Sequence, residues 1–170
     1  MLKRTMFRVL FFSLLFSFCF IGAAYAKDPF QASGLPIPRF VSTASDMVFV
    51  RAGPALRYPI KWVLQKEGLP LEVVQEFDTW RKVRDIKGDE GWVHQSLLKG
   101  RRTVIIHTDA PMDLLKRPES GAAVMARLEP NVVASVQECL NTWCKVSAES
   151  YSGWVIREGL WGLYDGEVLD

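Results

Sequence analysis

The chain has 170 residues, 49% of them hydrophobic and 24% charged, and its formal net charge is +2. Three bases near the N-terminus, Lys3, Arg4 and Arg8, account for that surplus, because residues 27–170 contain 18 Lys+Arg and 19 Asp+Glu. This near-neutral balance argues against a nucleic-acid partner, since such binding depends on a surplus of cationic groups over phosphate. Residues 27–170 suffice for one ordinary domain or two very small ones.

Residues 1–26 have the organisation of a secretory signal peptide. The basic residues are followed by an apolar run, Val9–Ala23, and then by the small-x-small site Ala24-Tyr25-Ala26 before Lys27. We predict a signal helix that is cleaved between Ala26 and Lys27, leaving a periplasmic protein that meets the membrane only before cleavage. The apolar run is shorter than the roughly 20 residues of a transmembrane helix, and an uncleaved anchor is the alternative. Bulky residues flank Cys19, which disfavours a lipoprotein signal.

The next segment, residues 27–45, is predicted to be an extended linker that contains prolines. Its sequence GLPIPRF, from Gly34, has two prolines one residue apart, a pattern typical of polyproline-like backbone. Two alternatives are open: the segment packs against the folded part of the chain, or it is itself bound as a ligand.

The rest of the chain contains an internal repeat. The sequence TWRKVRDIKGDEGWV from Thr79 corresponds to TWCKVSAESYSGWV from Thr142, so that Trp80 aligns with Trp143 and Trp92 with Trp154. Each unit is about 60 residues long, which is too long for a solenoid repeat and suits a small barrel.

Short apolar runs alternate with turn signals in the first unit. We expect strands at residues 47–51, 61–64, 71–77, 80–86 and 91–94. Such runs, with a turn signal about every 8–12 residues, are typical of a small all-β barrel or sandwich. In the second unit we interpret residues 120–128 as a loop and the second strand. An α/β unit is disfavoured because no uninterrupted helical stripe follows the signal.

Five motifs occur in order in the first unit: Val50-Arg51-Ala52-Gly53-Pro54, Tyr58-Pro59, Gly68–Val73, Trp80–Val83 and Gly91–His94. Together they resemble the bacterial SH3-like (Src-homology-3-type) domain. The second unit keeps only the last two motifs cleanly, and has Lys116-Arg117-Pro118 in place of the first. The resemblance implies an all-β protein of two small SH3-like β-barrels in tandem, one at residues 46–102 and a diverged copy at residues 103–170.

Two cysteines follow the signal, Cys139 and Cys144, and in the alignment they replace Glu76 and Arg81. These positions flank a tight turn, so we expect them to face each other across a hairpin. Directly opposed strand residues are close enough for a disulfide, and an oxidising compartment permits one. We predict a structural disulfide here, and an opposite-charge pair at the same place in the first unit. A zinc site would need more ligands, and a redox pair would need a thioredoxin-like context.

The candidate ligand-binding residues are Arg51, Tyr58, Trp62, Trp80 and Trp92. Trp80 and Trp92 have counterparts in the second unit, which favours a role in building the barrel. Tyr58 and Trp62 occur only in the first unit, beside the loop that borders the peptide groove in SH3-like folds, and amphipathic aromatic residues favour such surfaces. Packing as a lid over the core is the alternative for these two.

The two histidines, His94 and His107, do not indicate an active site. His94 follows Gly-Trp-Val at a position where the second unit has Ile156, so the imidazole is dispensable to the barrel. The sequence contains no nucleophile elbow and no phosphate-binding loop. We predict a non-enzymatic protein without a cofactor or a metal ion. Because SH3-like domains often accompany cell-wall hydrolases, a role as accessory to such an enzyme is a further alternative.

The two units carry opposite net charges. Residues 51–102 contain 11 Lys+Arg and 7 Asp+Glu, whereas residues 103–170 contain 5 and 10. In one hypothesis the basic unit binds carboxylate-rich material such as peptidoglycan stem peptides, through Arg51, Arg57, Lys61, Arg81 and Arg84. In another the two units dock and form a rigid adaptor subunit, and in a third both are solvated faces that contribute little. The resemblance favours a module that binds cell-wall peptide or an envelope protein.

Overall fold

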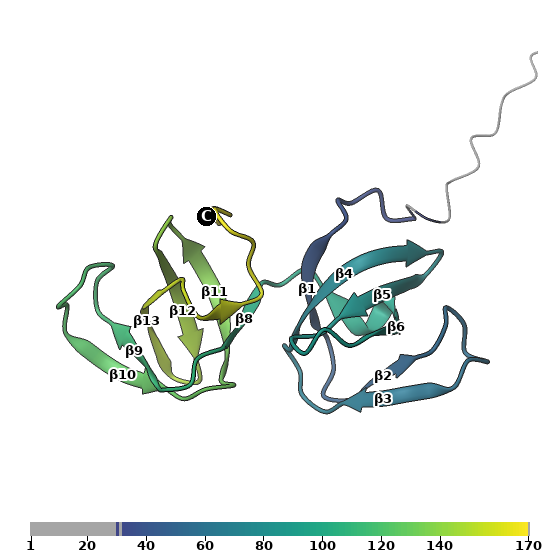
Figure 1. The fold of residues 1–170 in the computed structure, drawn as a ribbon, viewed down its shortest axis with the longest axis horizontal. Helices are drawn as coiled ribbons and strands as arrows, with labels where there is room; N and C mark the ends of the chain where they lie inside the picture. The colour runs from purple at the N-terminus through teal and green to yellow at the C-terminus, as the bar shows by residue number, and fades with distance from the viewer. Residues whose placement is uncertain (1–29, 31, 170) are drawn as a thin grey trace, which may run out of the picture.

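The computed structural model describes residue 30 and residues 32–169. The predicted signal peptide and its cleavage point between Ala26 and Lys27 lie outside the described residues. Within the described part the chain forms two seven-stranded antiparallel sheets, one after the other along the sequence (Figure 1). The prediction of an all-β protein with two SH3-like units in tandem is confirmed. No helix among the described residues is long and apolar enough to cross a membrane.

The first sheet contains all five strands predicted for the first unit, together with two more. Its strand order is β3-β2-β6-β5-β4-β1-β7. The elements are β1 (Arg39–Thr43), β2 (Val48–Arg51), β3 (Ile60–Leu64), β4 (Pro70–Phe77), β5 (Trp80–Arg84), β6 (Glu90–His94), the 3₁₀ helix η2 (Gln95–Leu97) and β7 (Leu98–Lys99).

The second sheet repeats this topology strand for strand. Its order is β10-β9-β13-β12-β11-β8-β14, and the predicted second strand of the unit is present as β10. The strands are β8 (Thr103–Ile106), β9 (Met112–Leu115), β10 (Val124–Leu128), β11 (Val133–Cys139), β12 (Trp143–Ala148), β13 (Tyr151–Ile156) and β14 (Leu160–Trp161).

Strand β1 corrects the interpretation of residues 27–45 as an extended linker. Residues 39–43 of that segment pair with β4, from Arg39↔Val73 to Ser42↔Pro70, and also with β7. The strand begins directly after Pro38, which is compatible with proline lacking a backbone N–H for the ladder. The two prolines before it suggested polyproline-like backbone for the whole segment, so the sequence did not predict the strand that follows them.

The repeated Gly-Trp-Val motif has a packing explanation in both barrels. A Cβ on Gly91 would lie 2.4 Å from Cγ1 of Val50, and a Cβ on Gly153 would lie 2.7 Å from the carbonyl oxygen of Leu115. Only glycine fits such close approaches inside a strand. The following residue points outward and the next one inward, so Val93 is fully buried.

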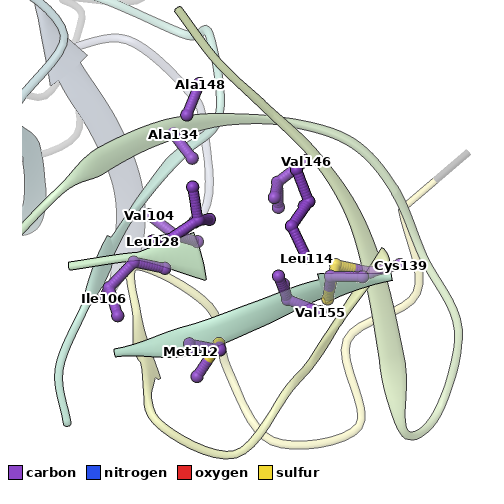
Figure 2. Close-up of a cluster of buried hydrophobic side chains, with 11 residues drawn as sticks. Val104, Ile106, Met112, Leu114, Leu128, Ala134, Cys139, Val146, Ala148 and Val155 are labelled. Atoms are coloured by element: carbon purple, nitrogen blue, oxygen red, sulfur yellow. A yellow bond between two sulfur atoms is a disulfide. The ribbon is translucent and has the colours of Figure 1, made fainter. Parts of the chain in front are cut away.

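Each barrel has its own apolar core. Seven buried residues form the first: Val41, Val48, Val50, Leu71, Val73, Val83 and Val93. The core of the second barrel includes both cysteines together with Leu114, Val146 and Val155 (Figure 2). Valine supplies six of the seven residues of the first core, as suits the interior of a barrel this narrow. The second core mixes valine and isoleucine with leucine, methionine, alanine and the two cysteines.

The two barrels touch through aromatic side chains. The ring of Phe40, on β1, lies 5.1 Å from the ring of Trp161 and 4.9 Å from that of Tyr164, measured between centroids. The Tyr164 hydroxyl donates a hydrogen bond of 3.0 Å to Oε1 of Glu72. Burial of the phenol and this bond to a carboxylate raise the pKa of Tyr164. The C-terminal part of the second barrel thereby packs against the first barrel.

Candidate functional site

The hairpin between β4 and β5 carries a buried ion pair at the positions predicted from the repeat. Glu76 and Arg81 are register partners, and Oε1 of Glu76 lies 3.1 Å from Nε of Arg81. At the equivalent positions of the second barrel, Cys139 and Cys144 are register partners joined by a disulfide with their Cα atoms 4.1 Å apart. The predicted disulfide and the predicted charge pair are both confirmed.

Two further residues complete the environment of Glu76, whose side chain is fully buried. Its oxygens accept hydrogen bonds from the backbone N–H of Ser33 (2.8 Å), the hydroxyl of Ser33 (2.6 Å) and the guanidinium of Arg39 (2.6 Å). Burial alone would raise the pKa of Glu76, but the bonds from Ser33 and Arg39 and the charge of Arg81 hold it below its ordinary value. Glu76 is therefore a buried carboxylate with four donors.

The burial of Arg81 corrects its assignment to a basic surface. The residue is only 5% exposed, and its guanidinium also donates to the carbonyl of Asp78 (2.8 Å) and to Oε1 of Gln95 (2.7 Å). Arg84 is exposed but pairs with Glu72 at 3.1 Å and with Glu90 at 2.8 Å. The excess of basic residues in the first unit thus overstates the number of free surface cations.

Arg51 and Tyr58 belong to one structural element, the loop between β2 and β3. Nη1 of Arg51 donates to the carbonyls of Leu56 (3.1 Å) and Tyr58 (2.9 Å). The Tyr58 ring covers Gly53, where an added Cβ would be 2.7 Å from the ring carbons. The guanidinium of Arg57 lies over the Tyr58 ring, 5.1 Å from its centroid. The loop is thus fixed by its own arginine and tyrosine.

Trp92 extends this surface across the sheet. It is the register partner of Arg51 on β2 and of Lys82 on β5, so the three side chains share the outer face of the barrel. The ammonium of Lys82 is paired with Glu90 at 2.6 Å. We refer to Arg51, Tyr58, Lys82 and Trp92 as the outer-face surface. Lys82 was not among the sequence candidates, although its alternation with buried Arg81 and Val83 places it on this face.

The other two tryptophan candidates lie elsewhere. Trp62 packs against the core of the first barrel, and the end of its indole would be 3.3 Å from a Cβ on Gly91. Lys61 covers it with its ammonium 4.9 Å from the ring centroid. Trp80 is 8% exposed and contacts the His94 ring edge-on, with centroids 5.4 Å apart. These positions match the packing alternative for Trp62 and the barrel-building role considered for Trp80.

His94 has a local structural partner. Its Nδ1 is 2.8 Å from the hydroxyl of Ser96, and the imidazole caps η2. A contact between residues two positions apart at the start of a 3₁₀ helix is a capping arrangement. No group of three or more His, Cys, Asp or Glu residues in the described part of the chain could hold a metal ion.

Comparison with known proteins agrees with this geometry. The sequence model of the bacterial SH3 domain matches residues 44–100 and again residues 108–162, more than half of the chain. The chain belongs to the bacterial SH3 domain family. Strands β1 and β8 precede the two matched regions, although each is an integral part of its SH3 sheet.

Longer proteins contain similar sequence. The chain is 27% identical over 125 residues to YrvJ of Bacillus subtilis (strain 168), which is named as a candidate N-acetylmuramoyl-L-alanine amidase. The match covers 68% of this chain and 24% of that protein.

Two solved structures, NlpC2 and NlpC1 from Trichomonas vaginalis, share 11% and 12% identity with the chain. Each has a TM-score of 0.33 and is covered over 48% of its length, against 73% and 77% of this chain. Similarity at this level carries no structural argument.

The two SH3 domains differ at the outer-face surface. In the second domain Trp154 faces Lys145 across the sheet, as Trp92 faces Lys82 in the first. However, Leu115 is the other register partner of Trp154, where the first domain has Arg51. The tryptophan therefore has an arginine as its register partner in the first SH3 domain and a leucine in the second.

Proposed function

We propose that the protein is an exported, non-enzymatic binding module whose first SH3 domain recognises carboxylate-bearing peptide of the cell wall. The observation that carries the proposal is the placement of Arg51 directly across the sheet from Trp92, beside Tyr58. An arginine offers planar donors suited to carboxylates, and a half-exposed tryptophan and tyrosine offer apolar surface with polar edges. Peptide recognition commonly uses this combination.

Three other observations support the location and the target. The sequence begins with the pattern of a secretory signal. A disulfide is typical of proteins that mature in an oxidising compartment, and Cys139 and Cys144 form one. The relative in Bacillus subtilis is named as a candidate N-acetylmuramoyl-L-alanine amidase. Since the chain spans about a quarter of that relative, its amidase activity is not carried over.

Retention by purified peptidoglycan sacculi tests the proposal. We expect the wild-type protein to sediment with sacculi at low salt, and Arg51→Gln and Trp92→Ala to reduce retention by about tenfold or more. Trp154→Ala is the matched control, because the same residue type at the same barrel position lacks an arginine partner. Wild-type protein that stays in the supernatant would refute wall binding. Release of soluble wall fragments by the purified protein would refute a purely binding role.

A second function, as an adaptor subunit in the envelope, is favoured by the contact between the two domains. Phe40, Trp161 and Tyr164 hold the barrels together, as a scaffold that presents two faces at a fixed angle requires. Co-purification from the envelope tests this role. It is favoured if one defined envelope protein is recovered with the wild type but not with Phe40→Ala, while the wild type and Phe40→Ala sediment equally with sacculi.

A further inference from the structure

A cavity of about 410 Å³ lies against the first barrel, separate from the outer-face surface. It is bounded by the segment before β1, by β1 itself and by β7, and it shares none of the four outer-face residues. Its volume lies within the range of small-molecule sites, roughly 300–1,000 Å³. Its size and its separate lining make the cavity a second candidate binding site.

The lining of this cavity has one sign of charge. Four of its residues are cationic, namely Arg39, Arg81, Lys99 and Arg102, and none is acidic. The rest of the wall is largely apolar, with Leu35, Val73 and Leu98 among its members. Cations set in apolar walls attract an anionic group more strongly than they would in open solvent.

Two of the cationic lining residues share one counter-charge, which leaves a surplus of positive charge. Arg39 and Arg81 share the single carboxylate of Glu76, at 2.6 and 3.1 Å. Burial and the repulsion from Arg39 together lower the pKa of Arg81, even though Glu76 opposes them. A ligand anion at this point would complete the neutralisation of the two guanidinium groups.

Two other lining residues, Lys99 and Arg102, also have donors for a ligand. Nε of Arg102 is buried and has no acceptor within the described part of the chain. The two Nη atoms of Arg102 are held by Glu167 at 2.7 and 2.8 Å and by the carbonyl of Gly162 at 3.0 Å. Lys99 pairs with Glu67, which is exposed, and such pairs break at little cost. Lys99 can therefore turn to a ligand.

We propose that this cavity binds a small monocarboxylate with a short aliphatic part, such as the C-terminal residue of a peptide. The guanidinium and ammonium groups take the carboxylate, and the apolar wall takes the aliphatic group. The proposal goes beyond wall recognition by the outer face, and it holds or fails independently of sacculus binding.

Calorimetric titration of the full chain with three probes tests this site. The probes are N-acetyl-Ala-Ala with a free carboxylate, the same dipeptide as its C-terminal amide, and inorganic phosphate. We expect saturable binding of the free acid and at least tenfold weaker binding of the amide, because charge-assisted hydrogen bonds are lost. Phosphate should bind at least tenfold more weakly than the free acid, since it gains nothing from the apolar wall.

Two variants locate the binding. Gly100 lines the cavity, and an added Cβ there would meet nothing within 4 Å, so Gly100→Leu should fill the entrance without disturbing the fold. We expect Gly100→Leu to weaken binding of the free acid tenfold or more and Lys99→Gln several-fold. Lys87→Gln removes the same charge from an exposed turn and should change nothing.

Several results would overturn the proposal. These are no heat from the free acid at millimolar concentration, equal affinity for acid and amide, or equal affinity for acid and phosphate. Binding that persists in a folded Gly100→Leu protein, or that falls equally in Lys87→Gln, would place the anion elsewhere. Sacculus retention is measured separately, so its failure leaves these results unaffected.

Discussion

The Glu76 carboxylate lies 3.1 Å from the guanidinium of Arg81, at the cross-strand positions that the second SH3 domain fills with a disulfide. The same pair of hairpin positions is thus linked by an ion pair in one domain and by a disulfide in the other. The ionic version depends on both charges being present and on the donors from Ser33 and Arg39. The covalent version needs neither, and it is part of an apolar core.

Replacing Glu76 with Gln should destabilise the first domain by about 3–5 kcal/mol, because the change leaves two guanidinium groups in a buried place without their counter-charge. Urea unfolding followed by tryptophan fluorescence measures the difference. Asp113→Asn is the control, since it removes an exposed ion pair with Arg127 and should cost less than about 1 kcal/mol. Similar losses in both variants would contradict the importance assigned to burial.

The same carboxylate predicts an acid-sensitive first domain. The pKa of Glu76 is lower in the folded protein than its ordinary value of 4.5. The unfolded chain therefore binds the proton more readily, and the stabilisation is present above pH 4.5 and is lost as pH falls through the lower folded-state pKa. We expect the advantage of wild type over Glu76→Gln to shrink between pH 5 and the acid limit of folding. An unchanged difference over that interval would contradict the shift.

Reduction of Cys139–Cys144 should lower the stability of the second domain only modestly. The bond spans a sequence separation of 5, and closing so short a loop contributes about 2 kcal/mol in the chain-entropy account. Thermal unfolding with and without dithiothreitol should show one shifted transition and one unchanged. The double variant Cys139→Ala, Cys144→Ala should be insensitive to the reductant, and a shift in that variant would point to another cause.

The glycines of the repeated motif should tolerate alanine unequally. An added Cβ at Gly91 would lie 2.4 Å from a methyl group of Val50 and 3.1 Å from the backbone oxygen of Arg51, whereas at Gly153 it would lie 2.7 Å from the backbone oxygen of Leu115. The closer backbone contact is therefore at Gly153, and backbone shifts less readily than a side-chain methyl group. We expect both changes to cost about 1–3 kcal/mol, with Gly153→Ala the more damaging in its own domain. The two domain transitions in a denaturant titration separate the effects. A larger loss of unfolding free energy for Gly91→Ala than for Gly153→Ala would contradict this explanation.

Local patterns in the sequence predict most of this fold. The repeat, the alternation of apolar residues and the turn residues locate the strands, and the alignment of two hairpins locates the disulfide. The environment of Arg81 was beyond such reasoning, since its neighbours Ser33 and Arg39 are more than 40 positions away along the chain. A charge count also cannot distinguish a paired, buried guanidinium from a free one. Similarly, five candidate residues shared an aromatic or basic character, but only the sheet register separates outward Trp92 from inward Trp62.

Strand β1 ends one residue before the first matched region begins at residue 44, yet it lies between β4 and β7 in the sheet. Strand β8 likewise precedes the second match: it ends at Ile106, and the match begins at residue 108. A fragment trimmed to the homologous residues would lose a middle strand and, in the first domain, the donors that satisfy Glu76. Each folded sheet therefore extends beyond its region of homology. A fragment of the first domain should begin at or before Ser33, and a fragment of the second at or before Thr103.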